Sequence, residues 1–179
     1  MESEVGKGSC FSIFLELSPS RKTVPSRSKR NRRAIRLSGG SCVKALVVDD
    51  VEVNRELLSE VLKAVGVETM EAENGKEALE CLDAFEPHII FMDMQMPVMN
   101  GEEAVKEIIR QYGSDRFKIV AITALAFDHQ REKFKLLGCD DYIAKPFRIS
   151  HIYDCIQKLL GVKFEHEDEK QESRISEEK

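Results

Sequence analysis

The sequence predicts an α/β protein with a five-stranded parallel sheet covered by helices on both faces. Between residues 42 and 163, short apolar runs alternate with longer amphipathic segments. Continuous apolar runs are typical of parallel strands buried on both faces, and amphipathic segments of helices that cover them. Gly66, Gly138 and Gly161 follow three of the amphipathic segments, where glycine commonly ends a helix. Five strand–helix units in succession favour one domain with right-handed crossovers.

Each element can be placed from its pattern. The strands are predicted at Ala45–Val48, Val67–Met70, Ile89–Met92, Phe117–Ile122 and Tyr142–Ala144. Five helices follow these strands, and the fourth is predicted at about 127–137. The other four have apolar faces at helical spacing: Leu57, Leu58, Val61, Leu62 and Val65 in the first; Ala78, Leu79, Leu82 and Phe85 in the second; Ala104, Val105, Ile108 and Ile109 in the third; and Ile149, Ile152, Tyr153, Ile156, Leu159 and Leu160 in the fifth. Asn54 is predicted to cap the first of these helices.

The segments on either side of this domain differ from it in composition. Residues 1–20 contain one alternating run, Phe11–Leu17, which is typical of a single strand. Residues 21–41 hold eight basic side chains and no acid, among Pro, Ser and Gly, and are predicted to be a flexible linker. Residues 164–179 are rich in acids and lysines without an apolar pattern, and a disordered acidic tail is expected.

Bulk properties exclude several classes of protein. The formal net charge is −5, and no apolar run approaches the roughly 20 residues that span a bilayer. The five cysteines are widely spaced with no Cys-x-x-Cys pair, so we expect small buried thiols and neither a disulfide framework nor a metal cluster. Together with the absence of a secretory signal pattern, these features predict a cytoplasmic protein without membrane contact.

Polar residues follow four of the predicted strands. Asp49 and Asp50 follow the first strand, Asp93 the third, Thr123 and Ala124 the fourth, and Lys145 and Pro146 the fifth. In open α/β sheets ligands bind at the carboxyl ends of the strands, so these side chains are expected to converge. Each alone is ordinary turn or capping chemistry, whereas their joint occurrence after the correct strands predicts a site.

The residue types predict phosphoryl chemistry. Three clustered carboxylates repel one another unless a cation neutralises them, and hard oxygen ligands suit Mg²⁺. A carboxylate beside such an ion can attack a phosphoryl group and form an aspartyl phosphate. The Lys145 ammonium and the Thr123 hydroxyl are expected to bind the phosphoryl oxygens.

These residues lie in motifs that resemble the CheY-like response-regulator receiver domain. The motifs are Val47-Val48-Asp49-Asp50, Phe91-Met92-Asp93 with Met94-Gln95-Met96-Pro97, Ile122-Thr123-Ala124, and Gly138 to Phe147 with Lys145-Pro146 inside it. The resemblance covers about two thirds of the chain and implies a flavodoxin-like (βα)5 fold with strand order 2-1-3-4-5.

The resemblance also implies a role for each site residue. It makes Asp93 the phosphorylated residue, with Asp49, Asp50, Asp93 and the backbone carbonyl of Gln95 as Mg²⁺ ligands. Thr123 and Tyr142 match the switch pair of the family, although the residues alone favour a half-buried aromatic at Tyr142. Lys145 matches the phosphate-binding lysine, and the Lys145–Pro146 bond is usually cis in the family. Ala124 leaves room for the phosphoryl group.

The segment from Ser3 to Leu17 resembles the end of a histidine-kinase ATPase domain, through Gly6-Lys7-Gly8-Ser9 and the alternating run after it. Residues 1–20 would then be a remnant of that domain, and the chain the C-terminal receiver of a bacterial hybrid sensor kinase. Neither a histidine-bearing helix nor an ATP-binding box is present, so we expect no kinase activity. The only reactions expected are self-phosphorylation and autodephosphorylation.

The predicted function is a two-component phosphorelay receiver whose partner is a histidine kinase or a histidine phosphotransfer protein. It is expected to be a monomer or a weak, phosphorylation-dependent dimer. Residues 21–36 lack aromatic side chains and a DNA-reading motif, so a solvated linker is favoured over nucleic-acid binding. Three alternative functions agree less well with these residues. An aspartate phosphatase needs Asp-x-Asp-x-Thr spacing, a flavin-binding module needs a phosphate-cradling loop, and a degenerate receiver would lack part of the site.

Overall fold

The computed structural model describes residues 2–4, 8–10, 34–38, 42–124 and 128–166. The chain divides into two compact units, Met1–Arg30 and Asn31–Lys179. In the first unit, β1 (Glu2–Glu4) pairs antiparallel with β2 (Gly8–Cys10). The predicted strand Phe11–Leu17 lies outside the described residues and stays a prediction.

The second unit contains the predicted parallel sheet. Its strands are β4 (Lys44–Val48), β5 (Glu68–Ala72), β6 (Ile89–Asp93), β7 (Lys118–Thr123) and β8 (Asp141–Ala144). All neighbouring strands are parallel, in the order β5-β4-β6-β7-β8. The flavodoxin-like architecture and the expected order 2-1-3-4-5 are therefore confirmed.

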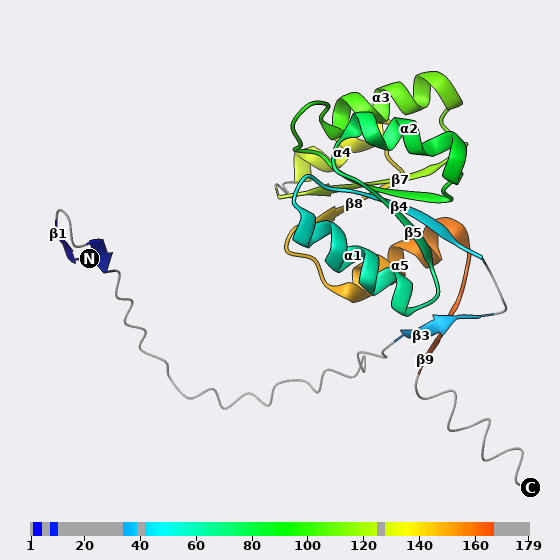
Figure 1. The fold of residues 1–179 in the computed structure, drawn as a ribbon, viewed down its shortest axis with the longest axis horizontal. Helices are drawn as coiled ribbons and strands as arrows, with labels where there is room; N and C mark the ends of the chain where they lie inside the picture. The colour runs from blue at the N-terminus through cyan, green and yellow to red at the C-terminus, as the bar shows by residue number, and fades with distance from the viewer. Residues whose placement is uncertain (1, 5–7, 11–33, 39–41, 125–127, 167–179) are drawn as a thin grey trace, which may run out of the picture. The chain divides into compact units, whose positions relative to one another are not determined.

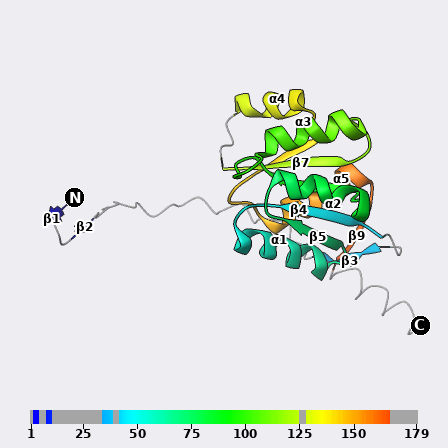
Figure 2. The same cartoon turned by 45° about the horizontal axis from the view of Figure 1, so that its top comes forward.

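Five helices cover the two faces of the sheet (Figure 1). They are α1 (Glu52–Ala64), α2 (Gly75–Phe85), α3 (Gly101–Tyr112), α4 (Asp128–Leu137) and α5 (Ile149–Leu160). Helices α1 and α5 lie on one face, whereas α2, α3 and α4 lie on the other, as Figures 1 and 2 show. The local signals agree with these bounds, since Asn74 and Asn100 cap α2 and α3 through their side chains.

Successive residues of each strand point to opposite faces and so supply two separate cores. In β4, Ala45 and Val47 contribute to the core beneath α1 and α5, while Leu46 and Val48 contribute to the core beneath α2, α3 and α4. Because both faces are buried, the strands carry the continuous apolar runs seen in the sequence.

A two-stranded ribbon outside the parallel sheet corrects two predicted boundaries. Strand β3 (Ala34–Leu37) pairs antiparallel with β9 (Phe164–His166), side by side in Figure 1. The predicted linker 21–41 and the predicted disordered tail 164–179 thus each contain a strand. The physical reason is burial, because Leu37 and Phe164 are only 5% and 4% exposed and join the core beneath α1 and α5.

The cysteines are free thiols at the four positions where their state is described. Cys139 and Cys155 are buried, as predicted, and Cys81 is half-buried. Cys42 is exposed, which contradicts the prediction of a buried thiol at that position. Within the described part of the chain, no helix is both long and apolar enough to cross a bilayer.

Candidate phosphorylation site

The register of the sheet brings the predicted residues to one edge. Val48 lies opposite Met92, Asp93 opposite Ile122, and Thr123 opposite Ala144. Asp49 and Lys145 are the residues that follow β4 and β8, so both lie at the same edge as Asp93 and Thr123.

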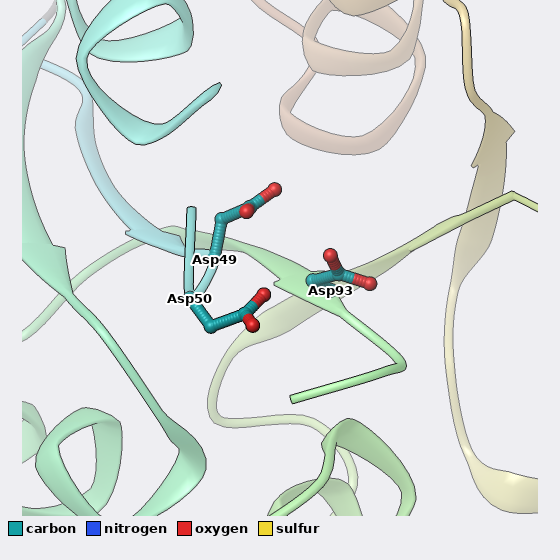
Figure 3. Close-up of side chains that lie close together, drawn as sticks. All are labelled: Asp49, Asp50 and Asp93. Carbon is teal, nitrogen blue, oxygen red and sulfur yellow. The ribbon is translucent and has the colours of Figure 1, made fainter. Parts of the chain in front are cut away.

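Three carboxylates meet there. One oxygen each from Asp49, Asp50 and Asp93 lies within 4.8 Å of the others, and Figure 3 shows the three groups around one space. Asp49 and Asp93 are buried, at 4% and 6% exposed, whereas Asp50 is exposed. Three like charges so close favour a cation among them.

Lys145 is an ion-pair partner for two of these carboxylates. Its Nζ atom donates to Oδ2 of Asp49 at 2.7 Å and to Oδ2 of Asp93 at 2.5 Å. Burial by itself would lower the pKa of Lys145, but these two hydrogen bonds outweigh it and raise the pKa above the ordinary lysine value. The ammonium therefore stays charged at neutral pH. The peptide bond between Lys145 and Pro146 is cis, as the resemblance implied.

Asn54 and Arg55 contact Asp49, a role that the sequence did not predict. The Nδ2 atom of Asn54 donates to Oδ1 of Asp49 at 3.2 Å, and the Arg55 guanidinium donates to the Asp49 backbone carbonyl at 2.6 Å. Asn54 does not cap α1, since Val51 occupies the cap position and makes no side-chain capping bond. Asparagine serves either role, so the sequence could not distinguish them.

The backbone around Asp93 is closely packed. The Gln95 N–H donates to Oδ1 of Asp93 at 3.0 Å, while Lys145 donates to Oδ2, so both oxygens of the carboxylate are held. Gly101, the first residue of α3, lies against this loop, and a Cβ there would come within 2.3 Å of the Asp93 carbonyl oxygen. Only glycine fits at this position without moving the backbone.

The remaining predicted residues lie nearby. The Thr123 side chain is buried, Ala124 is exposed, and the Thr123 carbonyl accepts a bond of 2.7 Å from the Lys145 N–H. Tyr142 is half-buried, and its ring stacks on that of Phe134 with centroids 6.4 Å apart. The Tyr142 ring therefore connects β8 to α4.

Residues of the acidic cluster line two hollows. One of about 600 Å³ is acidic and is lined by residues that include Asp50, Gln95, Asn100 and Glu102. The other, of about 380 Å³, is mostly apolar and lies between α1 and the segment after β8. Leu57, Pro146 and Phe147 line the second hollow together with Asp49 and Lys145.

A five-stranded fold of this order with an acidic cluster at its carboxyl edge defines a class of signalling domain. The family model of the response regulator receiver domain matches residues 45–157. The chain belongs to this family, a class of signalling domains in two-component systems.

Particular relatives agree with this assignment. The chain is 32% identical to the polar-differentiation response regulator DivK of Brucella anthropi, over 65% of this chain and 94% of that protein. Among solved structures it resembles the receiver domain of the sensor histidine kinase PA1611 from Pseudomonas aeruginosa, which holds a magnesium ion in its active-site cleft. That similarity is 30% identity with a TM-score of 0.61, over 68% of this chain and 99% of that one.

The receiver domain of Ssk1 from Saccharomyces cerevisiae, crystallised with the histidine phosphotransfer protein Ypd1, is also similar. It is 30% identical with a TM-score of 0.61, over 66% of this chain and 88% of that one. The family match begins at residue 45. The resemblance of residues 3–17 to a kinase ATPase domain, and with it the hybrid-kinase context, is not supported by these comparisons.

Proposed function

We propose that the chain accepts a phosphoryl group on Asp93 from a phosphohistidine donor and signals through the resulting change of conformation. The observation that carries this proposal is the position of the Asp93 carboxylate. It is buried, accepts a hydrogen bond from the Lys145 ammonium and has an oxygen within 4.8 Å of two further carboxylates. One of these, Asp50, is exposed and lines the acidic hollow, as do Met94 and Gln95, which follow Asp93 in the chain. A buried carboxylate that is hydrogen-bonded to an ammonium and lies next to an acidic hollow is suited to attack a phosphorus atom.

The donor set fits Mg²⁺. The carboxylates of Asp49, Asp50 and Asp93 offer hard oxygens from three directions, and we propose the Gln95 backbone carbonyl as a further ligand. Bound there, the ion would offset the charge of the carboxylates and of the incoming phosphoryl group. The magnesium ion in the similar PA1611 receiver supports this assignment.

In the proposed reaction an oxygen of Asp93 forms a bond to phosphorus while the bond from phosphorus to the donor's imidazole nitrogen breaks. The electron pair of that bond stays on the imidazole, which is then free to take a proton from solvent. The Lys145 ammonium already donates a hydrogen bond to Asp93. It can transfer this hydrogen bond to a phosphoryl oxygen and so neutralise the negative charge that develops during the transfer. This chemistry requires no kinase catalytic core.

Thr123, Ala124 and Tyr142 would relay the change. Thr123 lies at the end of β7 beside the site, and the small Ala124 leaves space next to it. Movement of the Thr123 hydroxyl toward a phosphoryl group would allow the Tyr142 ring to shift from its place against Phe134. A coupling of this kind is typically about 1–3 kcal/mol.

The proposed partner is a histidine kinase or a histidine phosphotransfer protein. Support comes from the complex of the similar Ssk1 receiver with Ypd1. It also comes from Val53 and Leu57 on α1 and Ile149 on α5, large apolar side chains that are 70%, 55% and 50% exposed. Exposed apolar residues beside a reactive centre favour protein docking. A cytoplasmic location, a monomeric or weakly dimeric state and the absence of nucleic-acid and membrane contacts stay predictions.

The proposal is tested by locating the phosphate. The protein is incubated with phosphoramidate, which like phosphohistidine has a phosphorus–nitrogen bond, in the presence of Mg²⁺. Borohydride then reduces an aspartyl phosphate to homoserine, and peptide mass spectrometry reads its position. Homoserine at position 93 is the expected result. Reduction at another aspartate, or at none, would contradict the proposal.

A further inference from the structure

The two oxygens of the Asp49 carboxylate have different partners. Oδ2 accepts from the Lys145 ammonium at 2.7 Å. Oδ1 accepts from the backbone N–H of Val51 at 3.0 Å and from the side-chain amide of Asn54 at 3.2 Å. Hydrogen bonds to both oxygens therefore fix the orientation of the carboxylate plane.

The carboxylate needs this support because its terminal torsion is soft. Rotation of an aspartate carboxyl group has a broad, roughly two-fold profile, so the covalent structure alone does not fix its plane. The neighbouring carboxylates of Asp50 and Asp93, within 4.8 Å, would also turn it away by repulsion. Two donors on Oδ1 oppose both effects.

Asn54 is itself well anchored. It lies in the first turn of α1, half-buried, and its N–H donates to the Val51 carbonyl at 3.0 Å. The next residue, Arg55, donates to the Asp49 backbone carbonyl at 2.6 Å and lies 3.7 Å from a Glu71 oxygen on β5. Arg55 thus joins the first turn of α1 to the ends of β4 and β5. These contacts fix the position of the backbone that carries the Asn54 amide.

We propose that Asn54 is a positioning residue of the phosphorylation site, acting through Asp49. Its amide holds the Asp49 carboxylate in the orientation that presents Oδ2 to Lys145 and to a divalent cation. The proposal rests on the function proposed above. Groups that orient a metal ligand commonly change metal affinity by 10- to 100-fold when they are removed.

The test is a titration of the ¹⁵N-labelled protein with MgCl₂, followed by NMR at the amides of Asp50 and Gln95. Asn54→Leu keeps the shape of the side chain and removes the donor, and Asn54→Ala provides a second, smaller substitution. Asn74→Ala is the matched control, because the hydrogen bonds of the Asn74 side chain are to Lys76 and Glu77 of α2 and not to the three carboxylates. The amide spectrum itself reports whether each variant is folded.

Both Asn54 variants are expected to raise the apparent Kd for Mg²⁺ about tenfold, while Asn74→Ala leaves it unchanged. Phosphorylation by phosphoramidate should need correspondingly more Mg²⁺ for its half-maximal rate, with most of the maximal rate recovered at saturating Mg²⁺. An unchanged Kd in both folded Asn54 variants would overturn the proposal, as would an equal rise in Asn74→Ala. If the wild-type protein shows no Mg²⁺-dependent shift, the proposed function itself fails, which is a separate result.

Discussion

The ring centroids of Tyr153 and Phe164 lie 5.1 Å apart and join the β3–β9 ribbon to α5. The Tyr153 hydroxyl also donates to the Val61 carbonyl on α1 at 3.1 Å, and the Leu37 N–H donates to the Val65 carbonyl at the end of α1. The ribbon therefore contacts both α1 and α5, the helices whose first turns lie near the proposed phosphorylation site. It lies outside the residues matched by the family model.

The ribbon is predicted to contribute to stability. Phe164→Ala should lower the free energy of unfolding by about 3 to 5 kcal/mol, because it leaves a cavity at a position that is only 4% exposed. Urea unfolding followed by circular dichroism measures the change. Glu165→Ala, in the same strand but not in the core, is the control and should cost far less. Equal unfolding midpoints for Phe164→Ala and wild type would show that the ribbon carries no stability.

Asp50→Asn is predicted to stabilise the Mg²⁺-free protein. Asp50 is exposed and lies beside two buried carboxylates, so removal of its charge relieves repulsion of about 0.5 to 1 kcal/mol. In millimolar Mg²⁺ the order should reverse, because the wild type gains binding free energy that the variant loses. Thermal melts with MgCl₂ and with EDTA test this. The control is Glu56→Gln, which removes an exposed acid on α1 and should show neither effect. A wild-type Tm that does not change with Mg²⁺ would refute the prediction.

Gly101→Ala is predicted to damage the site although alanine favours helices. A Cβ at this position would lie 2.3 Å from the Asp93 carbonyl oxygen and 2.8 Å from Met94 Cα, and both are backbone atoms that cannot turn aside. We expect a loss of at least about 2 kcal/mol in stability and slower phosphorylation of Asp93. Gly161→Ala is the control. Its φ of +68° is strained for alanine, but apart from the two chain neighbours no atom of the described residues would lie within 4 Å of the new Cβ. Only about 1 kcal/mol should therefore be lost, with phosphorylation unchanged.

The thiols of Cys42 and Cys139 are predicted to differ in reactivity toward alkylating reagents at mildly alkaline pH. Burial, with smaller contributions from Asp140 and Glu102, raises the pKa of Cys139 to about 12. A raised pKa lowers the thiolate fraction at any pH below it, by about a thousandfold at pH 8 relative to an ordinary cysteine. Iodoacetamide at pH 8 should therefore label the exposed Cys42 and leave Cys139 unmodified until the protein unfolds. Peptide mass spectrometry reads both sites, and equal labelling in the folded state would contradict the burial of Cys139.

The fold was largely predictable because its signal is local. Runs such as Ile89–Met92 are buried on both faces and are continuously apolar, which separates them from the amphipathic helices on either side. The carboxylates and Lys145 were predictable for a related reason, since the end of a parallel strand fixes where the following residue lies.

The ribbon and the Asn54 contact were not predictable on these grounds. Strands β3 and β9 are four and three residues long, too short for a clear sequence pattern. Each forms by pairing with a segment about 130 residues away in the chain, which local patterns do not reveal. Leu57 shows the same limit on a helix, because its periodicity places it on the apolar face of α1 although it is 55% exposed. Which polar contact Asn54 makes depends on where Asp49 lies in space.

The most direct test of the proposed function is intact-mass spectrometry after incubation with acetyl phosphate and Mg²⁺, with Asp93→Asn in parallel. We predict an increase by the mass of one phosphoryl group in the wild-type protein, lost with EDTA and absent in Asp93→Asn. An equal mass increase in folded Asp93→Asn, or none in a wild-type protein that also shows no amide shifts with beryllofluoride, would contradict the assignment of Asp93 as the phosphate acceptor.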